Sequence, residues 1–238
     1  MAPAADALAP GGVAIVPARL CLVGAGRLAT AFARRIASDA DLVAVSRHRG
    51  RLPRPDGCPD LVVFDTPATA AGSELVLLAV PAEQVPAAMR WLAPHLPAGT
   101  VVANLATELD TASVAPLLPG CQVIACKVVG QSGEIAAGAP AALVVSGTTL
   151  EQTRLVAAAL AGIGTVVAGD EQLAARVNET VARCMIGSHL LLVDGLDRLV
   201  LPDTVRQAAI ANLAVGILRA VSSGTAGPYL RRIMAELD

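Results

Sequence analysis

Residues 19–29, RLCLVGAGRLA, decide the fold of this chain. The stretch begins with a short apolar run, Arg19 to Val23, that ends in glycines, which is typical of a buried strand. It continues into Leu28, Phe32 and Ile36 at four-residue steps, which predicts a helix over residues 27–38. The sequence therefore predicts a strand, a tight glycine turn and a helix in direct succession.

The glycine turn carries the fingerprint GxGxxA, which is typical of dinucleotide-binding proteins when it joins a strand to a helix. Gly24 permits the tight turn, Gly26 keeps side-chain atoms away from a pyrophosphate, and Ala29 lets the helix pack closely on the sheet. The phosphates are expected beside Arg27 and Leu28, where free N–H groups and the helix dipole favour anions. The alternative is a fortuitous glycine-rich turn.

The end of the second predicted strand, residues 42–45, indicates which dinucleotide is bound. NAD-binding chains usually carry Asp or Glu here to hold the ribose 2′-hydroxyl. This chain carries Ser46, Arg47 and Arg49 instead. A hydroxyl and two guanidinium groups suit a 2′-phosphate, which arginine binds bidentately. We therefore expect NADP(H) as the cofactor, with a solvated arginine loop as the alternative.

Further short apolar runs predict the remaining strands. They lie at residues 61–64, 74–80, 100–103, 121–125, 142–145 and 164–167. Amphipathic segments around Val85, Met89 and Leu92, and over residues 150–160, predict helices between them. This alternation indicates an α/β fold of the Rossmann type, with a doubly wound, mostly parallel sheet that is covered on both faces.

After Asp170 no strand pattern is evident, and the sequence predicts helices only. Asp170 is a candidate N-cap for a long helix through Val200. Pro202 is placed to begin a second helix that runs to about Val221, and Pro228 to begin a third.

The predicted elements divide the chain into three parts. These are a flexible arm over residues 1–17, a dinucleotide-binding Rossmann domain over 18–169, and a small all-helical dimerisation and substrate domain over 170–238. The segment from Cys184 to Val193 is apolar nearly all round its helix, so every side of that helix must be covered. A partner subunit is the expected cover, which predicts a homodimer through the C-terminal helices; the first domain of the same chain is the alternative.

The composition excludes several classes of protein. Of the 238 residues, 54% are hydrophobic and 16% are charged, which excludes a disordered chain. The net charge of −2 argues against nucleic acid as a partner. No apolar run reaches the roughly 18 residues of a membrane-spanning helix, so no membrane is expected.

The cysteines and the N-terminus bear on location. The five cysteines are scattered without a metal-binding spacing, so we expect no metal. Cys21 and Cys184 stand in apolar runs and are expected to be buried free thiols, which favours a reducing cytoplasm. The first residues lack the features of a signal peptide, so the expected location is cytoplasmic.

A Rossmann-type domain followed by a helical tail resembles the pyrroline-5-carboxylate reductases, over most of the chain from Leu20. Four short stretches are similar to motifs of that family: Ala79-Val80-Pro81 to AVKPQ, residues 101–107 to IISIAAG, residues 127–133 to RVMPNTP, and residues 187–189 to GSGPA. The family's SPGGTT segment, which helps to bind the substrate carboxylate, is expected after Met234 and is missing.

The resemblance implies an NADP(H)-binding domain and a dimer built from interlocking helical tails. It also implies that Ala79, Val80, Pro81 and the region of Asn104 and Gln131 line the nicotinamide. Because the substrate segment is missing, a related imine or ketone is also a plausible substrate.

Hydride transfer needs a proton donor or a charge clamp beside the nicotinamide. Lys127 follows a predicted strand and is the only lysine, so it is a candidate for binding a substrate carboxylate or donating a proton; the alternative is a solvated lysine. Asn104 is a candidate partner of the ribose or the nicotinamide amide, or else caps a turn. His189, with Ser188 beside it, is a candidate proton donor, and a packed core histidine is the alternative.

We therefore expect an NADPH-dependent oxidoreductase that reduces the C=N bond of a small cyclic imine acid. Another NADP-dependent reductase on the same fold is an alternative, because residues 125–129 also resemble the lysine loop of deazaflavin-dependent NADP reductases. The strand and loop pattern also loosely resembles prephenate dehydrogenases. The third possibility is an NADP-binding protein without catalysis.

Overall fold

The computed structural model describes residues 17–37 and 40–237, and the chain forms two compact units, residues 1–179 and 180–238. Of the expected arm over residues 1–17, all but Pro17 lies outside the described residues, as does Ser38, the expected end of the first helix. The boundary between the units falls within one long helix, α6 (Glu171–Asp197), because the second unit begins at Thr180, ten residues beyond the expected domain start at Asp170. The first turns of α6 belong to the first unit, where Ala174 is buried.

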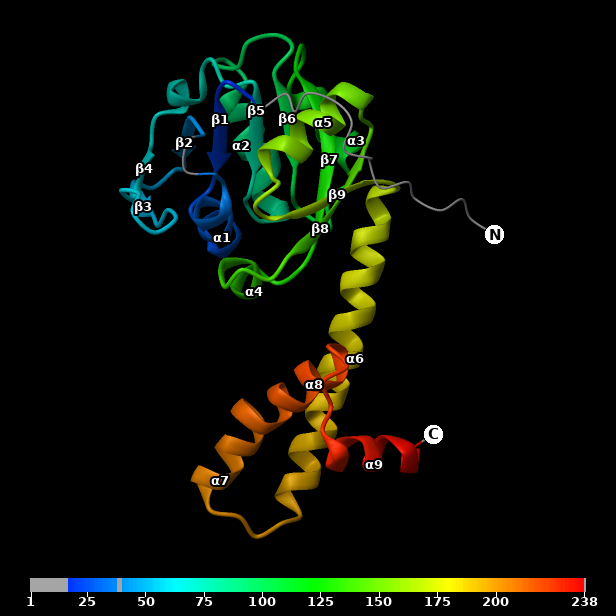
Figure 1. Ribbon diagram of the computed structural model, residues 1–238. Helices are drawn as coiled ribbons and strands as arrows, with labels where there is room; N and C mark the ends of the chain where they lie inside the picture. Colours follow the sequence, from blue (N-terminus) through cyan, green and yellow to red (C-terminus); the bar gives the residue numbers. More distant parts are fainter. Residues whose placement is uncertain (1–16, 38–39, 238) are drawn as a thin grey trace. The chain divides into compact units, whose positions relative to one another are not determined.

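A nine-stranded sheet organises the first unit within the described residues (Figure 1). Its strands are β1 (Leu20–Val23), β2 (Leu42–Val45), β3 (Gly50–Leu52), β4 (Leu61–Phe64), β5 (Leu75–Leu78), β6 (Val101–Asn104), β7 (Gln122–Val129), β8 (Ala141–Ser146) and β9 (Gly164–Ala168). The order across the sheet is β3-β4-β2-β1-β5-β6-β7-β8-β9. Only the β3–β4 and β7–β8 pairs are antiparallel, which confirms the mostly parallel α/β fold.

The helices of the first unit lie between these strands. They are α1 (Arg27–Arg35), α2 (Val85–Leu92), α3 (Thr111–Val114), α4 (Ser132–Ala136) and α5 (Leu150–Ala159), with single 3₁₀ turns η1 (Pro67–Ala70), η2 (Ala82–Gln84) and η3 (Ala115–Leu117). Neighbouring strand residues point to opposite faces, so the core is divided in two. On one face Leu22 packs in a cluster with Phe32 of α1, and on the other Val23 packs in a cluster with Met89 of α2.

Three departures from the expected elements have local causes. β3 lacks an apolar run because it is an edge strand, and Leu52 is its only buried residue. β7 continues to Val129, four residues past its expected end, because β8 pairs with its second half. α1 ends at Arg35, where Ile36 adopts an extended backbone.

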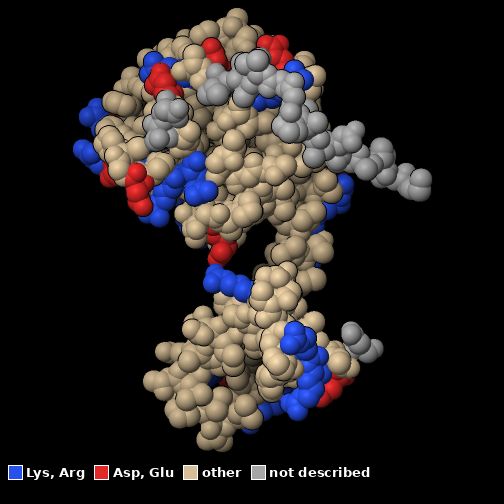
Figure 2. Space-filling model, in the orientation of Figure 1, with Lys and Arg blue, Asp and Glu red and all other residues tan. Residues whose placement is uncertain are grey.

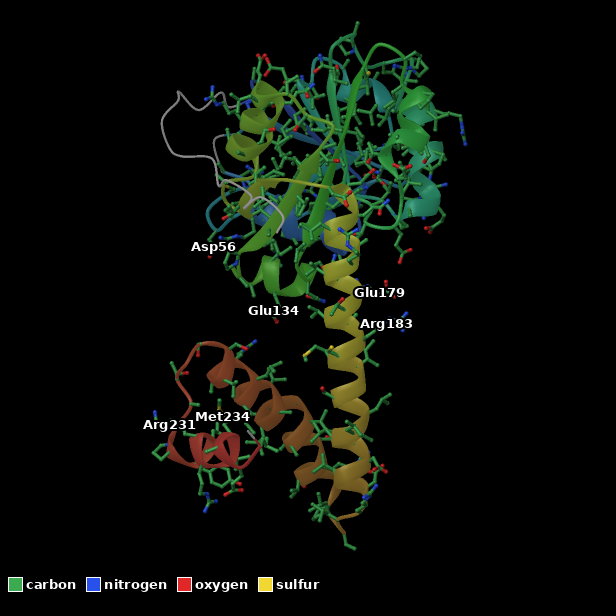
Figure 3. The ribbon with its side chains drawn as sticks, turned by 90° about the vertical axis from the view of Figure 1, so that its right-hand side faces the viewer. Asp56, Glu134, Glu179, Arg183, Arg231 and Met234 are labelled. Carbon is green, nitrogen blue, oxygen red and sulfur yellow. The ribbon has the colours of Figure 1, made fainter. Side chains whose placement is uncertain are left out.

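The second unit is entirely helical in its described part. It contains the C-terminal part of α6, then α7 (Asp203–Ala208), a π-helical segment η4 (Ala209–Ala214), α8 (Val215–Ser222) and α9 (Pro228–Leu237). Glu179 and Arg183, labelled in Figure 3, lie on α6 on either side of the unit boundary. The expected long helix, and the helices beginning near Pro202 and Pro228, are therefore present.

The helical unit has almost no core of its own. Among residues 180–237, Ala226 is the only buried apolar residue. The exposed large apolar side chains include Val181, Met185, Ile186, Leu190, Leu191, Leu213, Leu218, Tyr229 and Met234. Figure 2 shows that uncharged residues dominate the visible face of this unit. The expectation that Cys184 is buried is wrong for the single chain, because Cys184 is exposed.

The described residues contain no helix of the length and apolarity that crossing a membrane requires.

Candidate cofactor site

The glycine turn after β1 is fixed by its neighbours on both sides. The Gly24 amide donates to the carbonyl of Val45, the last residue of β2, at 2.8 Å. Gly24 has a φ of 117°, and a Cβ there would lie 2.5 Å from the Ala79 carbonyl oxygen after β5. A side chain at this position is therefore excluded both by the backbone conformation and by contact with the neighbouring strand.

Gly26 differs from Gly24 because nothing in the protein excludes a side chain there. A Cβ at Gly26 would meet no atom within 4 Å, and its φ of −83° is open to any residue. Gly26 is the N-cap of α1, yet no side chain caps this helix and its first turn contains no acidic residue. The space above a helix N-terminus is thus left open, which suits an anion that approaches the backbone amides.

A groove of about 490 Å³ lies along the carboxyl ends of the central strands. The glycine turn contributes Gly26, Arg27 and Leu28, the loops after β5 and β6 contribute residues 79–83 and 105–108, and Ser132 completes the lining. The expected site residues Ala79, Val80 and Pro81 therefore meet the glycine turn, and Ala29 is buried beneath it. An adjoining hollow of about 480 Å³ shares Gly26, Arg27 and Ser132 and adds Gln131.

The end of β2 lies beside the glycine turn, on the side away from β5. A small cavity there is lined by Gly24, Ser46, Arg47, Gln84 and Trp91, among others. The Arg47 guanidinium donates a hydrogen bond to Gln84 Oε1 at 2.9 Å. Arg49 forms an ion pair with Asp65 at 2.9 Å and is largely exposed. Of the three residues expected to recognise a 2′-phosphate, Ser46 and Arg47 thus line this cavity together with Gln84 and Trp91, whereas Arg49 does not line it.

Asn104, at the end of β6, is completely buried and holds the following loop. Its Nδ2 donates to the Leu109 carbonyl at 3.1 Å and to Thr111 Oγ1 at 3.0 Å. Its Oδ1 accepts from the Ala106 amide at 3.1 Å. These bonds correspond to the turn-capping alternative, and they occupy both ends of the amide group.

Lys127 lies within β7 and is 1% exposed. Its Nζ donates to the carbonyl oxygens of Ala106 at 2.6 Å and Leu109 at 2.8 Å, and lies 3.4 Å from Glu171 Oε2. Burial lowers the pKa of Lys127 below its ordinary 10.5, and the Glu171 carboxylate partly offsets this effect. The solvated-lysine alternative is wrong, because Lys127 is buried and its Nζ is bonded within the protein.

The remaining expected site residues are Gln131, Ser188 and His189, and they lie outside the buried cluster around Lys127. The Gln131 side chain accepts from the amides of Gly133 at 2.5 Å and Glu134 at 3.1 Å, so it caps α4. Ser188 and His189 are exposed on α6 in the helical unit, so His189 is not a core residue of the single chain. Their catalytic roles remain predictions.

Several contributing residues were not expected as site residues, among them Glu171, Thr111 and Gln84. Glu171 accepts from the Thr111 amide at 3.2 Å and from Thr111 Oγ1 at 2.8 Å, and it also faces Lys127. Gln84 faces Arg47 across the small cavity. Nothing in the sequence marks these pairs, because their members are 60 and 37 residues apart.

A larger cavity, about 630 Å³, lies at the opposite, amino ends of the central strands. Glu74 and Thr100, which line it, precede β5 and β6. In open α/β sheets ligands bind at the carboxyl ends of the strands, where the strand order reverses. Here the order reverses between β1 and β5, so the groove over the glycine turn is the candidate site despite its smaller volume.

Fold and glycine turn together define the class of this chain as a Rossmann-type α/β fold with a helical C-terminal unit. Two solved structures with this likeness are pyrroline carboxylate reductases. The enzyme of Plasmodium falciparum, solved with NADP bound, is 10% identical, with a TM-score of 0.66 over 95% of this chain and 86% of that one. The enzyme of Coxiella burnetii is 16% identical, with a TM-score of 0.65 over 93% and 85%.

These matches confirm, at the level of the fold, the resemblance seen in the sequence. A 3-hydroxyisobutyrate dehydrogenase of Mycobacterium tuberculosis also shares the fold, at 14% identity and a TM-score of 0.53 over 92% of this chain and 70% of that one.

One curated protein is similar in sequence. It is a glycerol-3-phosphate dehydrogenase [NAD(P)+] of Bradyrhizobium diazoefficiens, 36% identical over 86 residues. The match covers 36% of this chain and about a quarter (26%) of that enzyme's length. No protein-family model matches the chain.

Proposed function

We propose that this protein is an NADPH-dependent oxidoreductase that binds its cofactor along the carboxyl edge of the sheet. One observation carries the proposal: the open space over Gly26, at a helix N-terminus that no side chain caps. A pyrophosphate there accepts from the first amides of α1. The adenosine half then extends toward Arg47, and the nicotinamide half toward the loops after β5 and β6.

The groups at the end of β2 support NADP(H) over NAD(H). No carboxylate stands at positions 46–49 to accept from a ribose 2′-hydroxyl. Gln84 holds the Arg47 guanidinium beside Ser46, at the rim of the small cavity. A 2′-phosphate bound there accepts charge-assisted hydrogen bonds from Arg47, and from Arg49 if it exchanges Asp65 for the phosphate.

The cofactor assignment is tested by binding of NADPH and NADH to the variants Arg47→Ala and Arg49→Ala. Loss of a charge-assisted hydrogen bond raises the NADPH dissociation constant about tenfold or more and leaves that of NADH unchanged. Arg51→Ala is the matched control, because Arg51 is exposed on β3 in the same arginine-rich stretch. An NADPH dissociation constant that is equal in all three variants and the wild type would show that the assignment is wrong.

For the substrate, we propose the C=N bond of a small cyclic imine acid, reduced by hydride transfer. The likeness to two proteins described as pyrroline carboxylate reductases supports this class. The likeness to a protein described as 3-hydroxyisobutyrate dehydrogenase supports a second candidate, the interconversion of a small hydroxy acid and its carbonyl form. Both reactions move a hydride to or from the nicotinamide.

Turnover separates these candidates. The protein is incubated with NADPH and either pyrroline-5-carboxylate, a small keto acid or an oxidised deazaflavin, and the loss of reduced nicotinamide absorbance is followed. Oxidation of NADPH with the cyclic imine alone is the expected result. Tight NADPH binding without turnover on any of the three would instead favour a non-catalytic NADP-binding protein.

We also propose that the protein is a homodimer through its C-terminal helices. The support is the helical unit itself, in which large apolar side chains are exposed and Ala226 alone among the described apolar residues is buried. Helices of this kind gain most of their stability from packing an apolar face. In such a dimer, Ser188 and His189 lie on a helix that reaches the interface, and a cytoplasmic location remains our prediction.

A further inference from the structure

The β6–α3 loop, residues 105–110, is held on its inner side by a cluster of buried polar groups. Lys127 Nζ binds two of its carbonyls, those of Ala106 and Leu109. Asn104 binds the same Leu109 carbonyl and the Ala106 amide. The loop is therefore fixed at both of these residues by side chains that belong to β6 and β7.

Glu171 completes the cluster from α6. Its carboxylate lies 3.4 Å from Lys127 Nζ and accepts from the amide and hydroxyl of Thr111, directly after the loop. The ammonium thus faces two carbonyls and one carboxylate. A buried charge is tolerated only when it is paired and hydrogen-bonded in this way.

The outer side of the same loop lines the candidate cofactor groove. Residues 105–108 face the groove together with Gly26 and Val80. Because β6 is separated from β1 by β5, and β2 lies on the other side of β1, this loop belongs to the half of the groove away from Arg47. A dinucleotide whose 2′-phosphate lies at Arg47 therefore places its nicotinamide half against this loop.

We propose that Lys127 is a positioning residue, which sets the backbone of the β6–α3 loop against the nicotinamide half of the cofactor without touching it. This inference rests on the proposed function. Replacing a buried ion pair with apolar groups is often neutral for stability, so stability alone gives little reason for the ammonium. Its two short hydrogen bonds to loop carbonyls give it a geometric role instead.

The test compares two ligands in Lys127→Met, which keeps the length of the side chain and removes the ammonium. NADPH reaches both halves of the groove, whereas adenosine 2′,5′-bisphosphate reaches only the half near Arg47. Loss of the loop's anchor is expected to weaken NADPH about tenfold and the bisphosphate less than about twofold. Lys127→Arg retains a cation and its donors and is expected to bind NADPH more tightly than Lys127→Met.

Cys126→Ala is the matched control, because Cys126 is the neighbouring buried residue on β7 and, unlike Lys127, has no ammonium group to bind the loop carbonyls. It is expected to lower the unfolding temperature without selective loss of NADPH. The same selective loss in Cys126→Ala, or an equal change for both ligands in Lys127→Met, would overturn the inference. If Lys127→Met does not fold, Lys127→Gln, which also removes the ammonium, is measured with the same two ligands: selective loss of NADPH supports the inference, and an equal change for both ligands overturns it.

The outcomes separate this inference from the function on which it rests. Wild-type protein that binds neither ligand would overturn the proposed function and this inference together. Wild-type protein that binds both ligands, with Lys127→Met unchanged for both, would overturn the inference alone.

Discussion

At the scale of single residues, the two glycines of the turn have different physical tasks. Gly24 is required by the fold, because a Cβ there would lie 2.5 Å from the Ala79 carbonyl oxygen at a φ of 117°. Gly26 is not required by the fold, because a Cβ at this position would meet no protein atom within 4 Å. A stability effect and a binding effect are therefore separable within one tripeptide.

We predict that Gly24→Ala lowers the free energy of unfolding by about 1–3 kcal/mol, from backbone strain and the clash. Gly26→Ala costs no more than about 1 kcal/mol, the range of N-cap effects, yet weakens NADPH at least about tenfold by intruding on the pyrophosphate. Denaturant unfolding and NADPH titration of both variants measure these effects. Equal loss of stability in both, or undiminished NADPH affinity in Gly26→Ala, would contradict the assignment.

The buried thiols make the stability of the protein depend on alkaline pH. Burial raises the pKa of Cys126 and of Cys21 to about 12, from an ordinary 9.0. Between these values the folded state keeps protons that the unfolded state has lost. The stabilisation is complete below pH 9.0 and is lost as pH rises toward 12, at up to about 1.4 kcal/mol per pH unit for each thiol.

This prediction is checked by urea unfolding of the wild type and Cys126→Ala at several pH values above neutrality. The wild type is expected to lose stability more steeply than the variant above pH 9.0. Lys127 acts in the opposite direction, because its lowered pKa makes the folded state release its proton first, and both proteins carry Lys127. Parallel curves would show that Cys126 is not shielded as the fold implies.

Residue roles were predictable where they depend on neighbours in the sequence. The glycine turn and the arginines after β2 stand in local patterns; Gly26 lines the groove, and Gly24 and Arg47 line the small cavity beside it. The surroundings of Lys127 were not predictable, because its partners Ala106, Leu109 and Glu171 lie 18 to 44 residues away. The sequence shows that Lys127 follows an apolar run, but not that β7 continues through it.

At the scale of elements, the apolar runs predicted the strands of the sheet interior, and the amphipathic segments between them predicted the helices. The edge strand β3 was harder to predict, because only Leu52 is buried in it and its sequence has no periodic apolar pattern. The antiparallel pairing of β7 with β8 was also not predictable, since both strands are apolar in either direction. The tail helices were predicted from capping residues and from the absence of any strand pattern after Asp170.

The apolar tail helices lead to a prediction about assembly. We expect twice the mass of one chain by light scattering at micromolar concentrations, because helices with so little buried apolar surface are stabilised mainly by packing. In this dimer the Cys184 thiol, exposed in the single chain, is expected to react with a maleimide more slowly than in urea. A monomer with a rapidly labelled Cys184 would contradict the dimer.

At the scale of the whole molecule, the alanine-rich, charge-poor composition has two sources. In the first unit it comes from strands buried on both faces, with Leu22 and Val23 in opposite clusters of the core. In the helical unit the apolar side chains lie on the surface of the single chain. The apolar residues thus form a core in the first unit and, by our proposal, a subunit interface in the helical unit.

The central claim is that the groove over the glycine turn binds NADP(H), and Trp91 offers a direct test. It is the only tryptophan of the chain and lines the small cavity beside Ser46 and Arg47. Titration with NADPH, followed by energy transfer from Trp91 to the reduced nicotinamide, is expected to give saturable quenching. The expected NADPH dissociation constant is at least about tenfold below that of NADH, as loss of the 2′-phosphate contacts requires. The absence of saturable quenching with NADPH, or equal affinity for NADH, would contradict the account.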